Sequence, residues 1–140
     1  MMGKLLQRLQ DPKRSGVYRS ARIDEIAGAV KGTGLSLVEI VVGGKPALLE
    51  SIAKALEFPD WFGENWDALE DCLTDLSWRK AAGHVLVFEG IGALPADERG
   101  TLIDVLASAA QFWAGQGTPF FAVFVDPDSR LELPDLRRAA

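Results

Sequence analysis

Cysteine and histidine are scarce in this chain, which has one of each among its 140 residues. A lone cysteine, Cys72, cannot close an internal disulfide, so a disulfide-stapled secreted scaffold is excluded. Because His84 is the single histidine, the chain also lacks the side chains of a common structural zinc site. We therefore expect neither a metal nor a cofactor.

Long apolar segments are absent as well. No run approaches the roughly 18 apolar residues that a membrane span requires, and residues 1–10 contain no continuous apolar stretch of a secretory signal. We expect a soluble, cytoplasmic protein with no membrane partner. The length favours one domain with its own core, and a hydrophobic content of 48% excludes a wholly disordered chain.

Charge is distributed unevenly along the chain. The formal net charge is −5, yet residues 1–22 carry six basic residues and only Asp11 as an acidic one. Residues 57–75 contain no lysine or arginine, and their acidic residues are Glu57, Asp60, Glu64, Asp67, Glu70, Asp71 and Asp75. Such a cluster attracts basic partners and repels nucleic acid, although a solvated helix face without any function would look the same.

Apolar patterning predicts strands that alternate with helices. The expected strands are residues 35–42, 84–89 and 119–125, and the expected helices are residues 47–56, 65–76 and 95–114. Crossovers of this length imply a mostly parallel sheet flanked by helices. His84, at the start of its strand, is expected at an edge with its polar atoms satisfied.

The chain divides into a basic N-terminal extension (1–34), a main domain (35–126) and a C-terminal tail (127–140). Within the extension, residues 17–20 fit a short strand and residues 23–30 fit a helix. The basic residues of the extension either dock on the acidic segment or form a mobile tail, and we interpret them as a tail.

The segment 64–76 has two opposed sides when it is built as a helix at about 100° per residue. Its apolar stripe contains Trp66, Leu69, Leu73 and Leu76, and the opposite side carries Glu64, Asp67, Asp71 and Asp75. Cys72 lies off the acidic side and is interpreted as a small buried packing residue. Because clustered like charges destabilise a helix, a sequence that keeps them is a candidate for a functional surface.

Residues 59–74 read PDWFGENWDALEDCLT, and this stretch resembles the signature of the barstar family, intracellular inhibitors of the bacterial ribonuclease barnase. The order of elements from Leu35 to Val125 is also similar to the three-stranded parallel sheet and surrounding helices of that family. The resemblance implies a barstar-like α/β fold and a ribonuclease inhibitor without enzymatic activity. Its implied partner is a basic, extracellular-type ribonuclease, with no direct contact to nucleic acid.

In the family, the loop and the following helix plug the ribonuclease active site. The positions carried over as partner contacts are Trp61, Gly63, Asn65, Asp67, Glu70, Asp71 and Thr74. The resemblance implies that Asp71 enters the nuclease phosphate site, that Asp67 meets a neighbouring cation and that Trp61 packs on the catalytic histidine. A carboxylate offers the charge and the paired oxygens of a phosphate, so the helix would imitate the RNA backbone.

Departures from the family pattern leave the partner open. Glu70 stands where the best-known member has a tryptophan, and residues 108–112 lack an acidic residue that contributes to the known interface. Thus the target nuclease, like the oligomeric state, is not fixed by the sequence. Asn65 also has a plain structural interpretation as a helix cap, and Gly63 has one as a turn glycine.

The sequence leaves two other functions open. The first is a barstar-fold immunity or adaptor module whose basic protein partner is not a ribonuclease. The second is a hydrolase that uses Asp67 and Asp71 as a metal or acid–base pair. No lysine or histidine accompanies these carboxylates along the helix, and an exposed acidic stripe does not separate two pKa values. The sequence therefore disfavours the enzyme.

Overall fold

The computed structural model describes residues 3–60, 63, 65–128 and 130–136. The strands are β1 (Gly16–Ser20), β2 (Leu35–Val41), β3 (Gly83–Glu89) and β4 (Phe120–Val125). The α-helices are α1 (Lys4–Leu9), α2 (Asp24–Val30), α3 (Lys45–Ala55), α4 (Trp66–Leu73) and α5 (Ala96–Gly115), and short 3-10 helices lie at Pro12–Arg14 (η1) and Ile91–Ala93 (η2). The elements that the sequence predicts are present, with their ends shifted by a few residues.

The strands form one parallel sheet in the order β1-β4-β3-β2. The central strands β3 and β4 are apolar on both sides because helices cover both faces of the sheet. The predicted parallel sheet with flanking helices is confirmed, but the predicted number of three strands is wrong, since the described residues form four. The additional strand is β1, in which Val17 pairs in register with Ala122 of β4.

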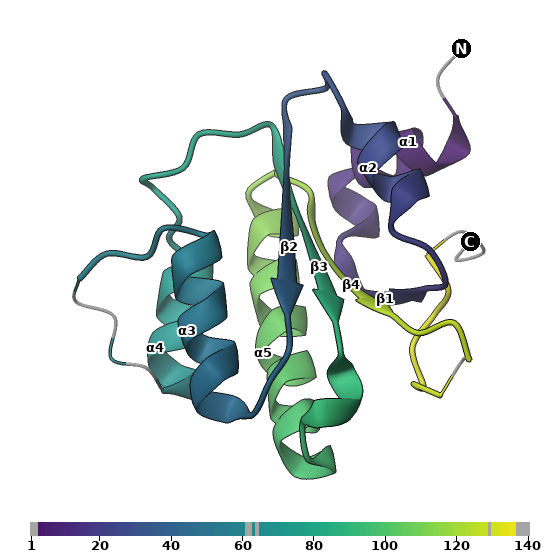
Figure 1. Cartoon of the computed structure of the whole chain (residues 1–140). Helices are drawn as coiled ribbons and strands as arrows, with labels where there is room; N and C mark the ends of the chain where they lie inside the picture. The colour runs from purple at the N-terminus through teal and green to yellow at the C-terminus, as the bar shows by residue number, and fades with distance from the viewer. Residues whose placement is uncertain (1–2, 61–62, 64, 129, 137–140) are drawn as a thin grey trace.

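Helices cover the sheet as two separate layers (Figure 1). The layer of α3, α4 and α5 buries the larger core, to which Leu69 and Phe88 belong. The layer of α1 and α2 buries a second core on the other face, to which Leu9 and Ile26 belong. Each fully buried leucine, isoleucine or phenylalanine contributes about 1.5–3 kcal/mol to folding, so both layers stabilise the sheet.

The basic N-terminal segment is part of the fold, and the expectation of a mobile tail is wrong. β1 and α2 form where the sequence allows a short strand and a helix. Leu9, Ile26 and Val30 are buried against the second face of the central strands. The physical reason is that these strands would otherwise expose Val87 and Phe121 to water.

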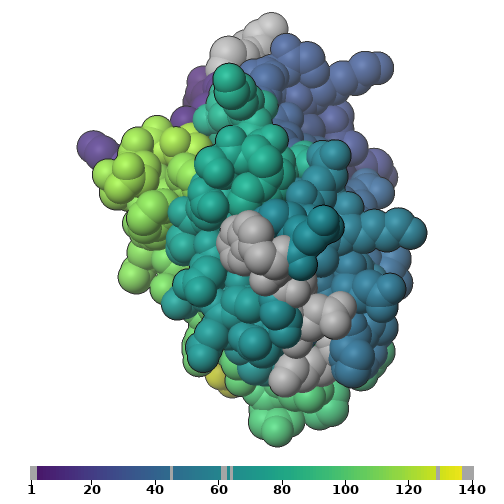
Figure 2. Space-filling view, turned by 90° about the vertical axis from the view of Figure 1, so that its left-hand side faces the viewer, coloured from purple at the N-terminus to yellow at the C-terminus, as the bar shows by residue number. Residues whose placement is uncertain are grey.

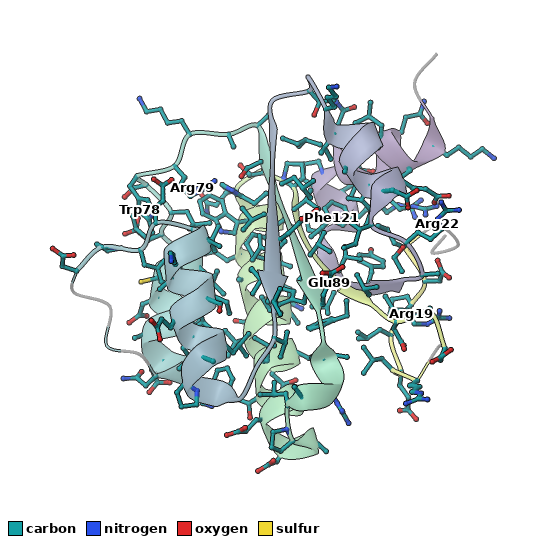
Figure 3. All side chains as sticks on the ribbon, viewed as in Figure 1. Arg19, Arg22, Trp78, Arg79, Glu89 and Phe121 are labelled. Carbon is teal, nitrogen blue, oxygen red and sulfur yellow. The ribbon has the colours of Figure 1, made fainter. Side chains whose placement is uncertain are left out.

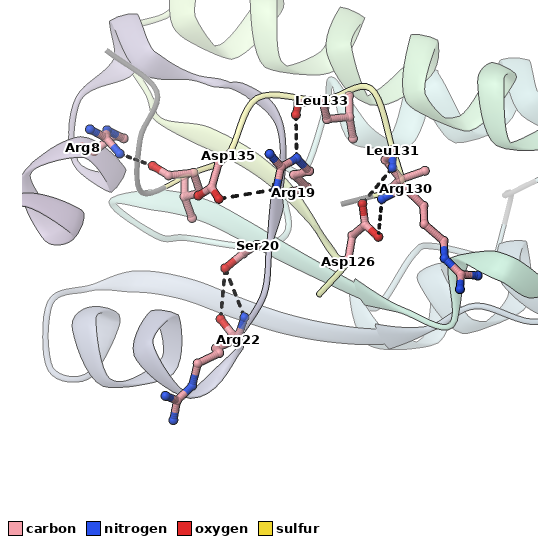
Figure 4. A network of polar contacts seen from close by, with 10 residues as sticks. Arg8, Arg19, Ser20, Arg22, Asp126, Arg130, Leu131, Leu133 and Asp135 are labelled. Carbon is pink, nitrogen blue, oxygen red and sulfur yellow. Dashed lines mark hydrogen bonds and ion pairs between the residues drawn. The ribbon is translucent and has the colours of Figure 1, made fainter. Parts of the chain in front are cut away.

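The C-terminal segment is tied to the same region (Figure 4). Arg19 Nε donates to the Leu133 carbonyl at 3.0 Å, and Arg19 Nη1 lies 3.4 Å from the Asp135 carboxylate. Arg8 donates to the carbonyl of Leu136, whose side chain is fully buried. Contacts therefore cross both predicted boundaries, although the division into residues 1–34, 35–126 and 127–140 itself stays a prediction.

The expectation that His84 lies at an edge is wrong. This residue lies in the central strand β3 and is only 3% exposed, and its Nδ1 has no hydrogen-bond partner among the described residues. Its ring centroid lies 5.5 Å from that of Trp113 and 6.3 Å from that of Phe120. Burial, and to a smaller extent the positive charge of Arg79, holds the pKa of His84 below its ordinary value.

Acid should therefore weaken the fold through His84. As the pH falls below about 6.5, the ordinary histidine pKa, the unfolded chain binds a proton that the folded chain resists, so the free energy of unfolding decreases. Urea unfolding at about pH 7.5 and about pH 5.5 should show this loss for the wild-type chain. His84→Phe should show little of it, because His84 is the single histidine. An equal loss of unfolding free energy in both proteins would contradict the assignment of the acid effect to His84.

Candidate functional site

The amino end of α4 is fixed by a side-chain cap. Asn65 has an extended backbone (φ −134°, ψ 172°), and its Oδ1 accepts a hydrogen bond from the Ala68 backbone N–H at 2.8 Å. Its Nδ2 donates to the Gly63 carbonyl at 3.4 Å, and a Cβ added to Gly63 would lie 3.3 Å from that Nδ2. The cap satisfies a backbone donor that the helix leaves free, and a side chain at position 63 would crowd it.

One side of α4 is anchored in the larger core. Leu69, Cys72 and Leu73 have no exposed surface, and the half-buried Trp66 packs against the same core. Burial, together with the negative charges of Asp71 and Asp75, raises the pKa of the Cys72 thiol to about 11. The thiol therefore stays protonated at neutral pH, and the interpretation of Cys72 as a packing residue is confirmed.

The other side of α4 presents carboxylates to water. Asp67, Asp71 and Asp75 are exposed, and in the space-filling view of Figure 2 the teal segment of α4 lies at the surface that faces the viewer. Among the described residues, the ion pairs are Arg19–Asp135, Arg22–Asp24, Arg79–Glu57 and Arg130–Asp128. No cation of the described chain neutralises α4, so its negative field extends into the solvent.

The carboxyl end of α4 is held by α5. Trp113 Nε1 donates to the Leu73 carbonyl at 2.7 Å, which satisfies one of the acceptors that the end of the helix leaves free. The hydroxyl of Thr74 donates back to the Glu70 carbonyl at 2.9 Å. With a cap at one end and an indole at the other, α4 is a fixed surface rather than a helix that must be ordered on binding.

Trp78 fastens the chain that follows α4 to the end of α3 (Figure 3). Its Nε1 donates to the Leu56 carbonyl at 2.9 Å, and its ring meets Phe58 edge-on at 6.0 Å between centroids. The next residue, Arg79, pairs with Glu57 at 2.8 Å. The indole N–H of Trp78 is thus already engaged within the protein.

Six of the seven predicted contact residues lie at position 63 and within residues 65–74 of the described chain. Gly63, Asn65, Asp67 and Asp71 are exposed, and Glu70 and Thr74 are half-exposed. Trp61 lies outside the described residues. Whether these residues contact a partner stays a prediction.

Sequence reasoning missed the contact that Trp113 of α5 makes with α4. Trp113 has the apolar spacing of a buried residue, but no local signal connects it with Leu73, which lies 40 positions earlier. Phe112, 42% exposed, places its ring edge-on against Trp113 at 5.3 Å between centroids. The exposed ring of Phe112 therefore neighbours the residue that holds the end of α4.

Two properties of the described residues bear on other functions. These residues contain no group of three or more histidine, cysteine, aspartate or glutamate side chains that is arranged to hold a metal ion. Within the same residues, no helix is both long enough and apolar enough to cross a membrane.

The parallel sheet, its two helical layers and the outward carboxylates of α4 define an α/β protein that presents a rigid acidic helix. Comparison with known families gives the class a name. Residues 41–125, more than half of the chain, match the family model described as Barstar (barnase inhibitor), so the chain belongs to the barstar family. No curated protein matches the chain.

The interpretation of Asn65 as a helix cap can be tested by substitution. Asn65→Ala removes the cap and should lower the free energy of unfolding by about 0.5–2 kcal/mol. Asn65→Asp keeps an acceptor for the Ala68 N–H and should stay close to wild type. Urea unfolding followed by circular dichroism measures both variants, and equal losses in the two would show that the cap does not stabilise α4.

Proposed function

We propose that the protein inhibits a basic ribonuclease by covering its active site with Gly63, Asn65 and α4. The observation that supports this most directly is the pair Asp67 and Asp71, which is exposed and unpaired among the described residues on a helix whose other side is buried. A ribonuclease holds RNA phosphates with cations, and a carboxylate offers those cations the same charge and two oxygens. α4 would therefore occupy the site as a substrate mimic.

The proposed roles follow the arrangement of the helix. Asp71 would enter the phosphate site, and Asp67, one helical turn earlier, would meet a second cation about 6 Å away along the axis. Trp61 would pack on the catalytic histidine of the nuclease. The half-exposed Glu70 and Thr74 would lie at the border of the contact, with the Thr74 hydroxyl already bound to its own helix.

The rigid attachment of α4 supports tight binding. A preformed surface loses little conformational freedom on association, so more of the contact energy remains as affinity. Its negative field also accelerates the encounter with a basic enzyme. In this role the protein would act as a cytoplasmic antitoxin or immunity protein in a bacterial cell that makes the nuclease, and it would catalyse nothing itself.

A specific residue favours the second candidate, a module that binds another basic protein. Glu70 places a half-exposed carboxylate where the resemblance implies a tryptophan contact. This residue fits a partner that offers a cation at that point instead of an apolar surface. An activity assay separates the two candidates, because only the first one abolishes RNA cleavage.

Mixing the protein with small basic microbial ribonucleases should abolish the activity of at least one of them near a one-to-one ratio. Fluorogenic RNA cleavage measures the inhibition, and size-exclusion chromatography measures the complex. If no ribonuclease is inhibited and none forms a complex, the ribonuclease-inhibitor proposal is wrong and the second candidate takes its place.

Asp71 should dominate the affinity for an inhibited ribonuclease. Asp71→Ala leaves buried nuclease cations unpaired and should weaken binding by about 2–5 kcal/mol, mainly through faster dissociation. Asp104→Ala removes an exposed carboxylate from α5 and serves as the matched control. Surface plasmon resonance gives both rates, and equal losses in the two variants would contradict an interface centred on α4.

Added salt should act mainly on the association rate constant. Screening of the long-range field slows association of oppositely charged proteins while it changes dissociation much less. Stopped-flow association with the same ribonuclease should therefore slow as salt is raised from low to physiological levels. An association rate that does not depend on salt would show that the field of α4 does not guide the encounter.

A further inference from the structure

A groove between α1 and α2 lies on the face of the sheet opposite to α4 (Figure 1). Its volume is about 770 Å³, within the range of about 300–1,000 Å³ that is typical of ligand sites. All its lining residues fall between Gly3 and Thr33, so the groove lies outside residues 41–125, which match the barstar family. The family match therefore does not account for it.

Positive charge dominates the rim of this groove. Lys4 and Lys31 are exposed and form no ion pair with a described residue. Arg8 is half-buried and is held in place by its hydrogen bond to the Leu136 carbonyl. Glu25 is the single acidic residue among those that line the groove. A protein with a net charge of −5 thus keeps a local excess of positive charge here.

Part of the lining of the groove is apolar. Leu5, Leu6 and Ala29 are only half-buried. Gly28 lies in the interior of α2, where glycine is less favourable than alanine. A Cβ added at Gly28 would have no atom within 4 Å, so the packing does not require glycine. The side chain that glycine lacks therefore leaves room in the groove.

We infer that this groove binds a short acidic peptide segment of another protein. Carboxylates of the segment pair with Lys4, Arg8 and Lys31, and its apolar side chains fill the space over Leu5 and Gly28. Charge complementarity supports this occupant. Salt screens charge interactions beyond about 8 Å, so a short segment in the groove interacts mainly with the nearby cations. An extended polyanion, such as a nucleic acid or an anionic membrane, also meets the repulsion of the whole chain.

An array of short fluorescent peptides that combine glutamate with leucine tests the inference by anisotropy on the full chain. At least one peptide should bind saturably and release when salt is added. Lys4→Glu and Lys31→Glu should each weaken this binding at least tenfold. Lys54→Glu, which changes an exposed lysine of α3, is the matched charge control and should leave it unchanged.

Gly28→Leu tests the shape of the groove without a change of charge. It should abolish peptide binding while the midpoint of thermal unfolding stays the same or rises, because leucine favours a helix. Gly100→Leu on α5, where an added Cβ is equally open, is the matched control and should bind normally. Asp71→Ala should also bind the peptide normally, which separates this groove from the proposed ribonuclease site.

Three results would overturn the inference. One is that no peptide of the array binds the wild-type chain. Another is that the control variants lose binding as much as the groove variants do. The third is that vesicles of anionic lipid bind the chain through Lys4 and Lys31 while the peptides do not, which would make a membrane surface the occupant.

Discussion

Burial of one side of α4 determines where its charges lie. With 3.6 residues per turn, the placement of Leu69 and Leu73 in the core requires Asp67 and Asp71 to face water. Each buried leucine contributes about 1.5–3 kcal/mol, whereas repulsion between carboxylates four residues apart costs only about 0.2–0.5 kcal/mol. The core therefore easily holds the carboxylates in an arrangement that is unfavourable by itself, and this makes the acidic surface available to a partner.

Part of the basic N-terminal segment lies across the sheet from α4. α1, with Lys4 and Arg8, lies on one face and α4 lies on the other (Figure 1), whereas η1, with Lys13 and Arg14, adjoins α5. Docking of the basic segment on the acidic helix, which the sequence left open, is not observed, since no ion pair joins the two among the described residues. Had the basic segment docked there, lysine and arginine would neutralise the carboxylates that the proposed function needs. The N-terminal layer instead covers the second face of β3 and β4.

Local sequence patterns predict much of this architecture. The stripe of Leu69 and Leu73 predicts both the helix and its exposed side, and Asn65 predicts where the helix begins. The role of β1 and the position of His84 depend on long-range pairing with β4, which no local pattern encodes. For the same reason the hydrogen bond from Trp113 to Leu73 is invisible in the sequence. Contacts within a segment were predictable, and contacts between distant segments were not.

The central claim is that Asp71 replaces a phosphate in the cationic site of a ribonuclease. The most direct measurement is a double-mutant cycle in which Asp71→Ala is combined with replacement of the arginine that binds phosphate in an inhibited nuclease. The account predicts a coupling energy clearly above zero, because two opposite charges that meet in a desolvated interface interact directly. Additive losses, with a coupling energy near zero, would show that the two groups do not meet and would contradict the account.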